Sequence, residues 1–279
     1  MAVWEADFYR RPLQADSGEP LWELLVCRAG DGVIYEAQCP QAQASAAWLR
    51  SQLQAAAQHE PPERVRVFRP QAVSLFQTVA PQVGATVEPT RRTRALKQEL
   101  QRRAARYPRA ANYTGEPRDL TQLDRPPPQP LPEAIWGEQW RFASLPAGDL
   151  ANFRERPIPI CQMPEALLPL ELGIASTAPV PGAIVYGGRQ AMQLAQWLAE
   201  AQPVTLNYIP TEAGRSGGLV LEAGLADRWV FATFDDADVA QAAQTYEQRK
   251  QAAQGLHFLL VQPDDSGKTD SGFWLLRDE

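Results

Sequence analysis

Hydrophobic and polar positions in the first 110 residues change period several times, and each change predicts an element of secondary structure. Short apolar runs bounded by Gly, Pro and Asp predict strands, and apolar positions spaced three or four apart predict helices. The predicted strands are Val3–Tyr9, Leu21–Arg28, Val33–Gln38, Arg64–Phe68 and Ala85–Glu88, and the predicted helices are Pro40–His59, Gln71–Ala80 and Arg91–Arg109. The order βββαβαβα predicts a mixed five-stranded sheet flanked by helices, and this is the element order of the ribonuclease H-like fold.

The second half of the chain predicts another α/β domain after a change in composition. Residues 111–135 are rich in proline and have no periodicity, which predicts an extended linker between domains at 1–110 and 136–279. The region up to about Leu172 has no clear pattern. The predicted strands beyond it are Ala183–Tyr186, Val204–Ile209, Leu219–Glu222, Trp229–Phe234, Leu256–Val261 and Gly272–Leu276, with helices near 191–198 and from Asp236 onward.

The last predicted strand is apolar on both faces. Neighbours in a strand point to opposite sides, so Trp274 and Leu276 share one face while Phe273 and Leu275 share the other. A strand of this kind is typical of one that is buried on both sides. Trp274 could therefore be a core residue, although the pattern alone leaves a surface role open.

One stretch, 91–109, concentrates positive charge in an acidic chain. It contains eight basic residues and one acid, Glu99, whereas the whole chain has a formal net charge of −6. The basic residues are Arg91, Arg92, Arg94, Lys97, Arg102, Arg103, Arg106 and Arg109. Leu96, Leu100, Ala104 and Tyr107 would form one apolar stripe, leaving the arginines on the solvent side. This pattern favours a phosphate-binding surface, and the alternative is a solvated helix whose arginines pair with acids elsewhere in the chain.

Composition indicates a globular protein that stays where it is made. Hydrophobic residues make up 44% and charged residues 22% of the 279 positions, and no apolar window is long enough to span a membrane. The first residues contain acids and aromatics without an apolar segment, so we expect neither a signal nor a transit peptide and a cytoplasmic location. The three cysteines form no Cys-x-x-Cys pair, which predicts reduced, structural thiols.

The sequence offers little for catalysis, metals or cofactors. His59 and His257 are its two histidines, and no Cys/His spacing fits a zinc site. Gly187-Gly188 and Gly267-Lys268-Thr269 resemble fragments of phosphate loops, but neither completes a motif. A metal-dependent nuclease could use Asp7 and Glu36, although the fourth strand supplies no further acid. We therefore predict a non-enzyme with no cofactor, no catalytic residues and no metal ligands.

Three tryptophan-rich blocks resemble the Tab-two/Atab-two family of RNA-binding proteins. They are Trp4–Leu13 with Leu21–Cys27, Trp136–Ala143, and Gly255–Leu276. The resemblance implies binding of A/U-rich single-stranded RNA and a role in translation of photosystem messages, photosystem I above all, with the translation machinery or ribosome as a further partner. It also implies that Trp274-Leu275-Leu276 takes part in RNA binding. Because plastid members carry a transit peptide, the chain is more similar to a cyanobacterial member.

Single-stranded RNA needs a positive track for its backbone and flat side chains for its bases. The basic stretch supplies the track. The aromatic candidates are Trp4, Tyr9, Tyr107, Tyr113, Trp136, Trp140 and Trp274, of which the two linker tyrosines and Trp140, with Arg141 beside it, are the favoured ones. The rival hypothesis is a protein-interaction scaffold for photosystem biogenesis that contacts RNA incidentally. The sequence predicts no oligomeric state.

Overall fold

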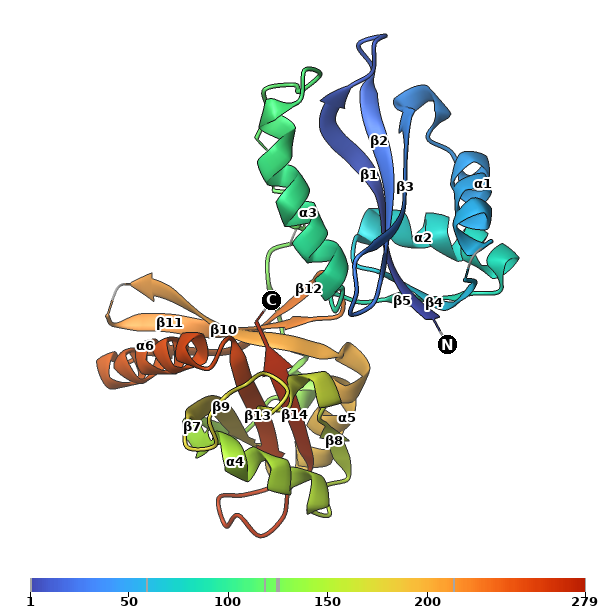
Figure 1. Cartoon of the computed structure of the whole chain (residues 1–279). Coiled ribbons are helices and arrows are strands. Elements are labelled where there is room, and N and C mark those ends of the chain that lie inside the picture. Colours follow the sequence, from blue (N-terminus) through green and yellow to red (C-terminus); the bar gives the residue numbers. More distant parts are fainter. Residues whose placement is uncertain (1, 59, 118, 124–125, 213, 279) are drawn as a thin grey trace. The chain divides into compact units, whose positions relative to one another are not determined.

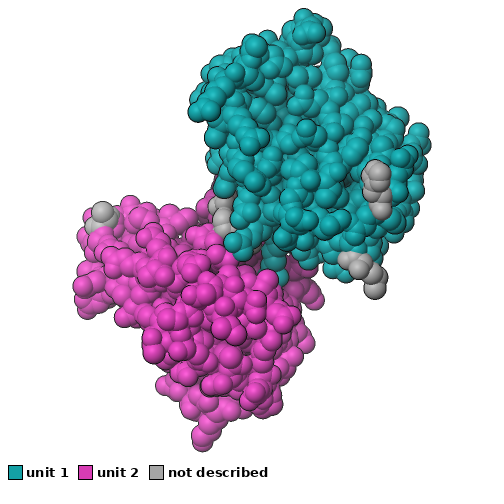
Figure 2. Space-filling view, viewed as in Figure 1, with its two compact units in different colours: residues 1–124 teal, residues 125–279 magenta. Residues whose placement is uncertain are grey.

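The protein consists of two compact units, residues 1–124 and 125–279 (Figure 2). A computed structural model describes residues 2–58, 60–117, 119–123, 126–212 and 214–278. Unit 1 and unit 2 each have their own sheets and cores, so we describe them separately.

Unit 1 is built on a five-stranded mixed sheet (Figure 1). Its strands are β1 (Ala2–Gln14), β2 (Pro20–Arg28), β3 (Val33–Pro40), β4 (Pro62–Val67) and β5 (Thr86–Pro89). They lie in the order β3-β2-β1-β4-β5, in which β1, β2 and β3 form an antiparallel meander while β4 and β5 run parallel to β1. The five strands predicted for this unit are confirmed, and β1 is longer than its apolar pattern indicates.

Three α-helices accompany this sheet, namely α1 (Ala46–Ala57), α2 (Pro70–Val79) and α3 (Arg94–Arg106). The predicted start of α1 at Pro40 is wrong. The helix begins after Ser45, whose hydroxyl accepts a hydrogen bond from the backbone N–H of Trp48, and a short 3-10 turn precedes it. The predicted end near His59 lies outside the described residues. The basic helix also begins later than predicted, because the backbone at Thr93 is not helical.

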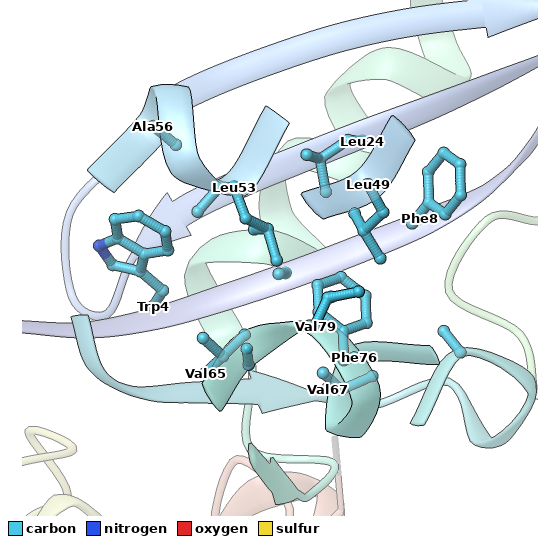
Figure 3. Packing of buried hydrophobic residues seen from close by; sticks show 14 of the residues in the cluster. Trp4, Phe8, Leu24, Leu49, Leu53, Ala56, Val65, Val67, Phe76 and Val79 are labelled. Carbon is cyan, nitrogen blue, oxygen red and sulfur yellow. The ribbon is translucent and has the colours of Figure 1, made fainter. Parts of the chain in front are cut away.

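The two faces of the unit 1 sheet are covered by different helices. On one face, Trp4, Phe8, Leu24 and Val26 pack with apolar side chains of α1 and α2 (Figure 3). The helices contribute Leu49, Leu53, Phe76 and Val79 to this cluster. On the other face, residues of alternate register, including Leu25 and Cys27, pack with Leu96 and Leu100 of α3. The alternation of β1 and β2 thus divides the unit into three layers.

The predicted linker at 111–135 packs against both units. Gln14 donates a backbone hydrogen bond to Asn112 at 2.9 Å, and Leu120 and Leu123 are buried beside α3. Farther along, Leu131 and Ile135 are buried in the core of unit 2. Isolated apolar residues among prolines gave no periodic signal for this packing.

Unit 2 contains two sheets and three α-helices (Figure 1). The five-stranded sheet has the order β7-β9-β13-β14-β8, and the four-stranded sheet has the order β10-β11-β12-β6. The strands are β6 (Gln129–Pro130), β7 (Gln139–Pro146), β8 (Ile160–Gln162), β9 (Pro179–Tyr186), β10 (Pro203–Glu212), β11 (Ser216–Ala223), β12 (Asp227–Asp235), β13 (Leu256–Gln262) and β14 (Gly272–Arg277). The helices are α4 (Ala147–Leu150), α5 (Ala191–Ala201) and α6 (Ala237–Ala252). The sequence did not predict β6, β7, β8 or α4.

The final strand, β14, is buried on both faces, as its pattern predicts. Trp274 and Leu276 share a core with Leu194 and Leu198 of α5. Phe273 and Leu275 belong to a second core on the other face of the sheet. That second core includes Ala147 and Leu150 of α4 and the stacked ring of Phe153. In neither unit is any described helix long and apolar enough to cross a membrane.

Candidate nucleic-acid interface

The start of helix α3 is held on the sheet of unit 1 by apolar contacts and by one carboxylate. Ala95, Leu96 and Leu100 are buried against the sheet. Glu5 on β1 accepts a hydrogen bond from the backbone N–H of Leu96 at 2.9 Å. A negative charge at the first turn satisfies a free N–H group and suits the helix dipole. The start of α3 is therefore fixed to the central strand.

Between the sheet and α3 lie four buried charged side chains, Asp7, Arg11, Glu23 and Arg69. Together with the half-buried Arg103 we call them the ion cluster. Asp7 accepts hydrogen bonds from Arg11 at 2.9 Å and from Arg69 at 3.0 Å. Arg11 also donates to Glu23 at 2.8 Å. Side chains alternate between the two faces of the sheet along β1 and β2. Asp7 and Glu23 therefore lie on the face under α3, opposite to the face that α1 and α2 cover.

The two carboxyl groups of the ion cluster have pKa values below their usual range, which favours their charged forms. Burial acts to raise the pKa of Asp7, but the guanidinium groups of Arg11 and Arg69 outweigh it and hold that pKa below the usual range. Burial likewise opposes ionisation of Glu23, whose pKa is nevertheless lowered by Arg11 and Arg103. Burying such a cluster costs free energy of folding. Breaking it costs free energy too, because removing one partner leaves the other charges buried with neither a partner nor water.

Arg103 belongs to the inside of unit 1, which corrects its assignment to the phosphate track. Its guanidinium donates to Glu23 at 2.7 Å and to Glu99 at 3.0 Å, and it also pairs with Glu36. Only 14% of its side chain is exposed. The alternative hypothesis for the basic stretch was that its arginines pair with acids elsewhere in the chain. At Arg103 this is what happens, since the fold places three carboxylates within reach of its guanidinium.

Two further predicted RNA contacts on this stretch are buried. Arg91 is 5% exposed and interacts with other groups of the chain. Tyr107 is 7% exposed and donates a hydrogen bond from its hydroxyl to Glu23 at 3.1 Å. Its ring belongs to the core under α3, so it offers no free face on which a base could stack.

The remaining arginines of the stretch point outward. Arg94, Arg102 and Arg106 lie on α3, and Arg109 lies in the 3-10 turn Tyr107–Arg109 that follows it. We call these four the outer face of α3, and all of them are exposed. Arg102 makes an ion pair with Glu99 at 3.1 Å while 59% of its side chain is exposed. Arg94, Arg106 and Arg109 have no acidic partner within the described part of the chain. Arg92 is also exposed and Lys97 is half-buried, and both interact with other groups.

The acids considered for a nuclease are held by arginines. Both oxygens of Asp7 accept from guanidinium groups, and Glu36 is paired with Arg103. At Asp7, guanidinium groups therefore occupy both oxygens that a metal ion would use, while at Glu36 one oxygen is paired. Across the described residues, no group of three or more His, Cys, Asp or Glu side chains could hold a metal ion.

The predicted contacts in unit 2 are divided between surface and core. Arg141 is exposed and donates to the hydroxyl of Tyr186 at 2.6 Å. Trp140 is half-buried and packs edge-on against Phe142. Trp274, Leu275 and Leu276 are each 1% exposed, so in this conformation they offer RNA no surface, and their part in RNA binding stays a prediction. A base cannot stack on a ring whose faces are covered by protein.

Trp136 is the most exposed tryptophan beside these residues. Its side chain follows a short 3-10 turn at Glu133–Ile135 and is 54% exposed. Sequence reasoning counted it among the aromatic candidates without favouring it. The signal that distinguishes it is position: it comes before strand β7 begins, whereas Trp140 and Trp274 lie within strands.

Comparison with known proteins identifies the family. The family described as "RNA-binding protein Tab2/Atab2" matches by its N-terminal part over residues 3–103 and by its C-terminal domain over residues 118–277. The chain belongs to this family. It is 31% identical to "Protein TAB2 homolog, chloroplastic" of Zea mays, over 99% of this chain and 71% of the relative. It is 30% identical to the protein of the same name from Arabidopsis thaliana, over 99% of this chain and 74% of that relative.

One solved structure shows a distant likeness that supports no inference. It is the simian T-cell lymphotropic virus intasome in complex with PP2A regulatory subunit B56 gamma. The match has a TM-score of 0.31 and 11% identity, and it covers 50% of this chain and 61% of the other. The family is identified from sequence, and the surface that would bind RNA has to be found in the geometry of this structure.

Proposed function

We propose that this Tab2/Atab2 family member binds A/U-rich single-stranded RNA without catalysis and assists translation of photosystem messages, chiefly those of photosystem I. Its membership in a family of RNA-binding proteins supports the RNA partner, and its relatives named as chloroplastic TAB2 homologs support a connection with photosynthesis. A role alongside the ribosome and a cytoplasmic location stay predictions.

The observation that carries the proposal is the outer face of α3. Arg94, Arg106 and Arg109 point to solvent without acidic partners among the residues that the structure describes, in a chain whose net charge is −6. Arginine forms charge-assisted hydrogen bonds with phosphate, and a row of such groups follows a nucleic-acid backbone. The ion cluster and Glu5 fix the helix beneath, so the backbone that carries these arginines is already ordered before RNA binds.

We further propose that unit 1 has a ribonuclease H-like arrangement. The sheet order β3-β2-β1-β4-β5 supports this, as does the sequence of a meander followed by parallel strands connected through α1 and α2. In this unit Arg11 and Arg69 occupy the carboxylate of Asp7. A sheet of this shape with arginines on its central acid suits binding more than hydrolysis.

The test is the salt dependence of RNA affinity for the double variant Arg94→Gln/Arg106→Gln. Each phosphate contact on a single strand contributes about −0.7 to the slope of log affinity against log salt. Losing two contacts should make the slope shallower by about 1.4 while sequence preference stays the same, since phosphate contacts position the strand without specifying it. Affinity for an A/U-rich single-stranded RNA would be measured by fluorescence anisotropy at several salt concentrations.

The matched control is Arg50→Gln/Arg249→Gln, which removes the same charge from exposed positions on α1 and α6. It should leave the slope unchanged, and both variants should melt close to the wild type. Equal slopes for all three proteins would place the track elsewhere. A flat salt profile or no RNA binding by the wild type would instead favour the protein-interaction scaffold.

A further inference from the structure

A mostly apolar pocket of about 340 Å³ opens within unit 2. It lies between the start of β7, the segment from Pro130 to Gly137, and residues 230–233 of β12. Its base is formed by Val185 of β9 and Leu194 of α5, which belong to the core of the unit. The size is that of a pocket for a single small ring system.

Trp136 forms one wall of this pocket and is held in place. Its indole N–H donates to the backbone carbonyl of Leu131 at 2.9 Å, while 54% of the side chain stays exposed. Because the indole N–H already has a hydrogen-bond acceptor, it does not need a water molecule as a partner. The exposed face of the ring can stack against another flat group. Trp140 supplies a second aromatic wall, which Phe142 supports edge-on with ring centroids 5.2 Å apart.

The opposite wall offers polar groups of the main chain. Strand β12 pairs with β6 only at Trp229 and Val230, and beyond that point the described strands leave this edge of β12 unpaired. Residues 231–233, which line the pocket, are on this edge. The side chains of Gln139 and Thr233 are the other polar groups of the lining. Donors and acceptors beside a stacking wall can recognise the edge of a heterocycle.

The lining contains no charged side chain. Each of its residues, from Pro130 to Thr233, is apolar, aromatic or neutral and polar. A phosphate or a carboxylate would gain no charged partner here, whereas a neutral aromatic ring would bury apolar area and keep its hydrogen bonds. The chemistry of the pocket therefore differs from that of the outer face of α3.

We propose that this pocket binds one unpaired nucleobase of an RNA strand, with Trp136 as the stacking wall and the edge of β12 contacting the polar edge of the base. The inference rests on the proposed RNA binding and adds to it a site for bases. The other ligand that an unpaired strand edge could accept is an extended peptide. The two indoles and the single-ring size favour a base, because a peptide adds along an edge and needs no aromatic wall.

The experiment compares three pocket variants with one control in binding to an A/U-rich single-stranded RNA. Trp136→Ala removes the wall, Trp136→Phe keeps an aromatic ring, and Ala232→Leu fills the pocket from β12. Leu170→Ala is the control, since Leu170 is an 86% exposed apolar residue outside the pocket lining. Melting temperature is recorded for each variant, so that a folding defect is recognised.

Trp136→Ala and Ala232→Leu should each weaken binding roughly tenfold, which is the size of one stacked base, and Trp136→Phe should restore most of the affinity. The loss should be the same factor at every salt concentration, because stacking releases no counterions. When the same RNA is annealed into a duplex, its bases are paired and cannot enter the pocket. The wild type and the pocket variants should then bind that duplex with equal affinity. Leu170→Ala should match the wild type.

Several outcomes would overturn the base pocket. The first is that Trp136→Ala, Trp136→Phe and Ala232→Leu all fold and all bind the RNA with wild-type affinity. If the salt slope of the wild type is normal in that case, the proposed function still stands. Binding of a strand-forming Val/Thr peptide that Ala232→Leu blocks, with RNA binding unaffected, would identify a peptide groove. If the wild type binds no RNA at any salt concentration, both proposals fail together.

Discussion

The two five-stranded sheets of the molecule solve the same burial problem with different chemistry. In unit 2, β13 and β14 are apolar on both faces, and each face packs into its own hydrophobic core. In unit 1, one face of the sheet is apolar, while the other face carries the ion cluster under α3. Both sheets are covered on two sides. In unit 1 several buried charges form one connected cluster beneath α3, whereas in unit 2 a single buried lysine, Lys250 of α6, donates to Leu206 and Asn207 of β10.

This difference explains why the arginines of α3 cannot be treated as one group. A helix placed over a purely apolar face would turn all its arginines to solvent, as the stripe of Leu96 and Leu100 predicts. Over the ion cluster, Arg103 turns inward to Glu23 and Glu99, and Arg94 and Arg106 stay outside. Charge density in a sequence therefore overstates the number of arginines available to a ligand.

The largest effect on this comparison should come from the apolar side. Trp274→Ala should destabilise unit 2 by about 3–5 kcal/mol, because it removes a tryptophan that is 1% exposed from between β14 and α5. Trp274→Phe should lose less, since it keeps an aromatic ring in the same space. Urea unfolding would measure both. Weakened RNA binding by Trp274→Ala at unchanged stability would contradict the core role and make Trp274 a direct contact.

On the charged side, Asp7→Ala should destabilise unit 1 by about 3 kcal/mol. The substitution leaves Arg69 and Arg11 buried without their shared carboxylate, although Glu23 still pairs with Arg11. Asp31→Ala is the control, because the side chain of Asp31 is 68% exposed and its ion pair with Arg28 spans 3.7 Å. That control should change stability little. Equal urea midpoints for the two variants would show that the ion cluster does not hold α3.

Acid should destabilise the two units at different pH values. His257 in unit 2 is buried and neutral, donating from Nδ1 to Gly255 and accepting at Nε2 from Leu206. Burial, with Lys250 nearby, lowers its pKa from 6.5 to about 3. Below pH 6.5 the unfolded chain therefore binds a proton that the folded chain refuses, and unit 2 should lose up to about 1.4 kcal/mol per pH unit down to about pH 3.

Unit 1 should respond later in the same titration. The pKa values of Asp7 and Glu23 are lowered from 3.8 and 4.5, so their contribution is present above those values and is lost as the pH falls below them. Hydrogen exchange followed by mass spectrometry at decreasing pH would report each unit. His257→Gln should abolish the early loss in unit 2, and a simultaneous loss in both units would contradict the assignment.

The sequence predicted most of the regular elements for a simple reason. Where one face of an element is buried, its period appears directly in the order of apolar residues, as it does for β2, β13 and α5. The same alternation predicted that Trp274 and Leu276 share one face of β14 and that Phe273 and Leu275 share the other, and this is confirmed. The elements that were missed are short or rich in proline, such as β8 and α4, and too few residues of them repeat to make a period.

The candidate sites were less accessible to sequence reasoning, because they depend on which residues meet across the fold. The sequence alone predicted two α/β parts and a basic helix, and its three tryptophan-rich blocks indicated the family. Only the tertiary structure decided that Arg103 meets Glu23, 80 positions away, and that Trp136 faces a strand edge contributed by residues 231–233. The physical reason is range: periodicity records what each segment buries, whereas ion pairs and pockets are made between segments whose separation along the chain carries no pattern.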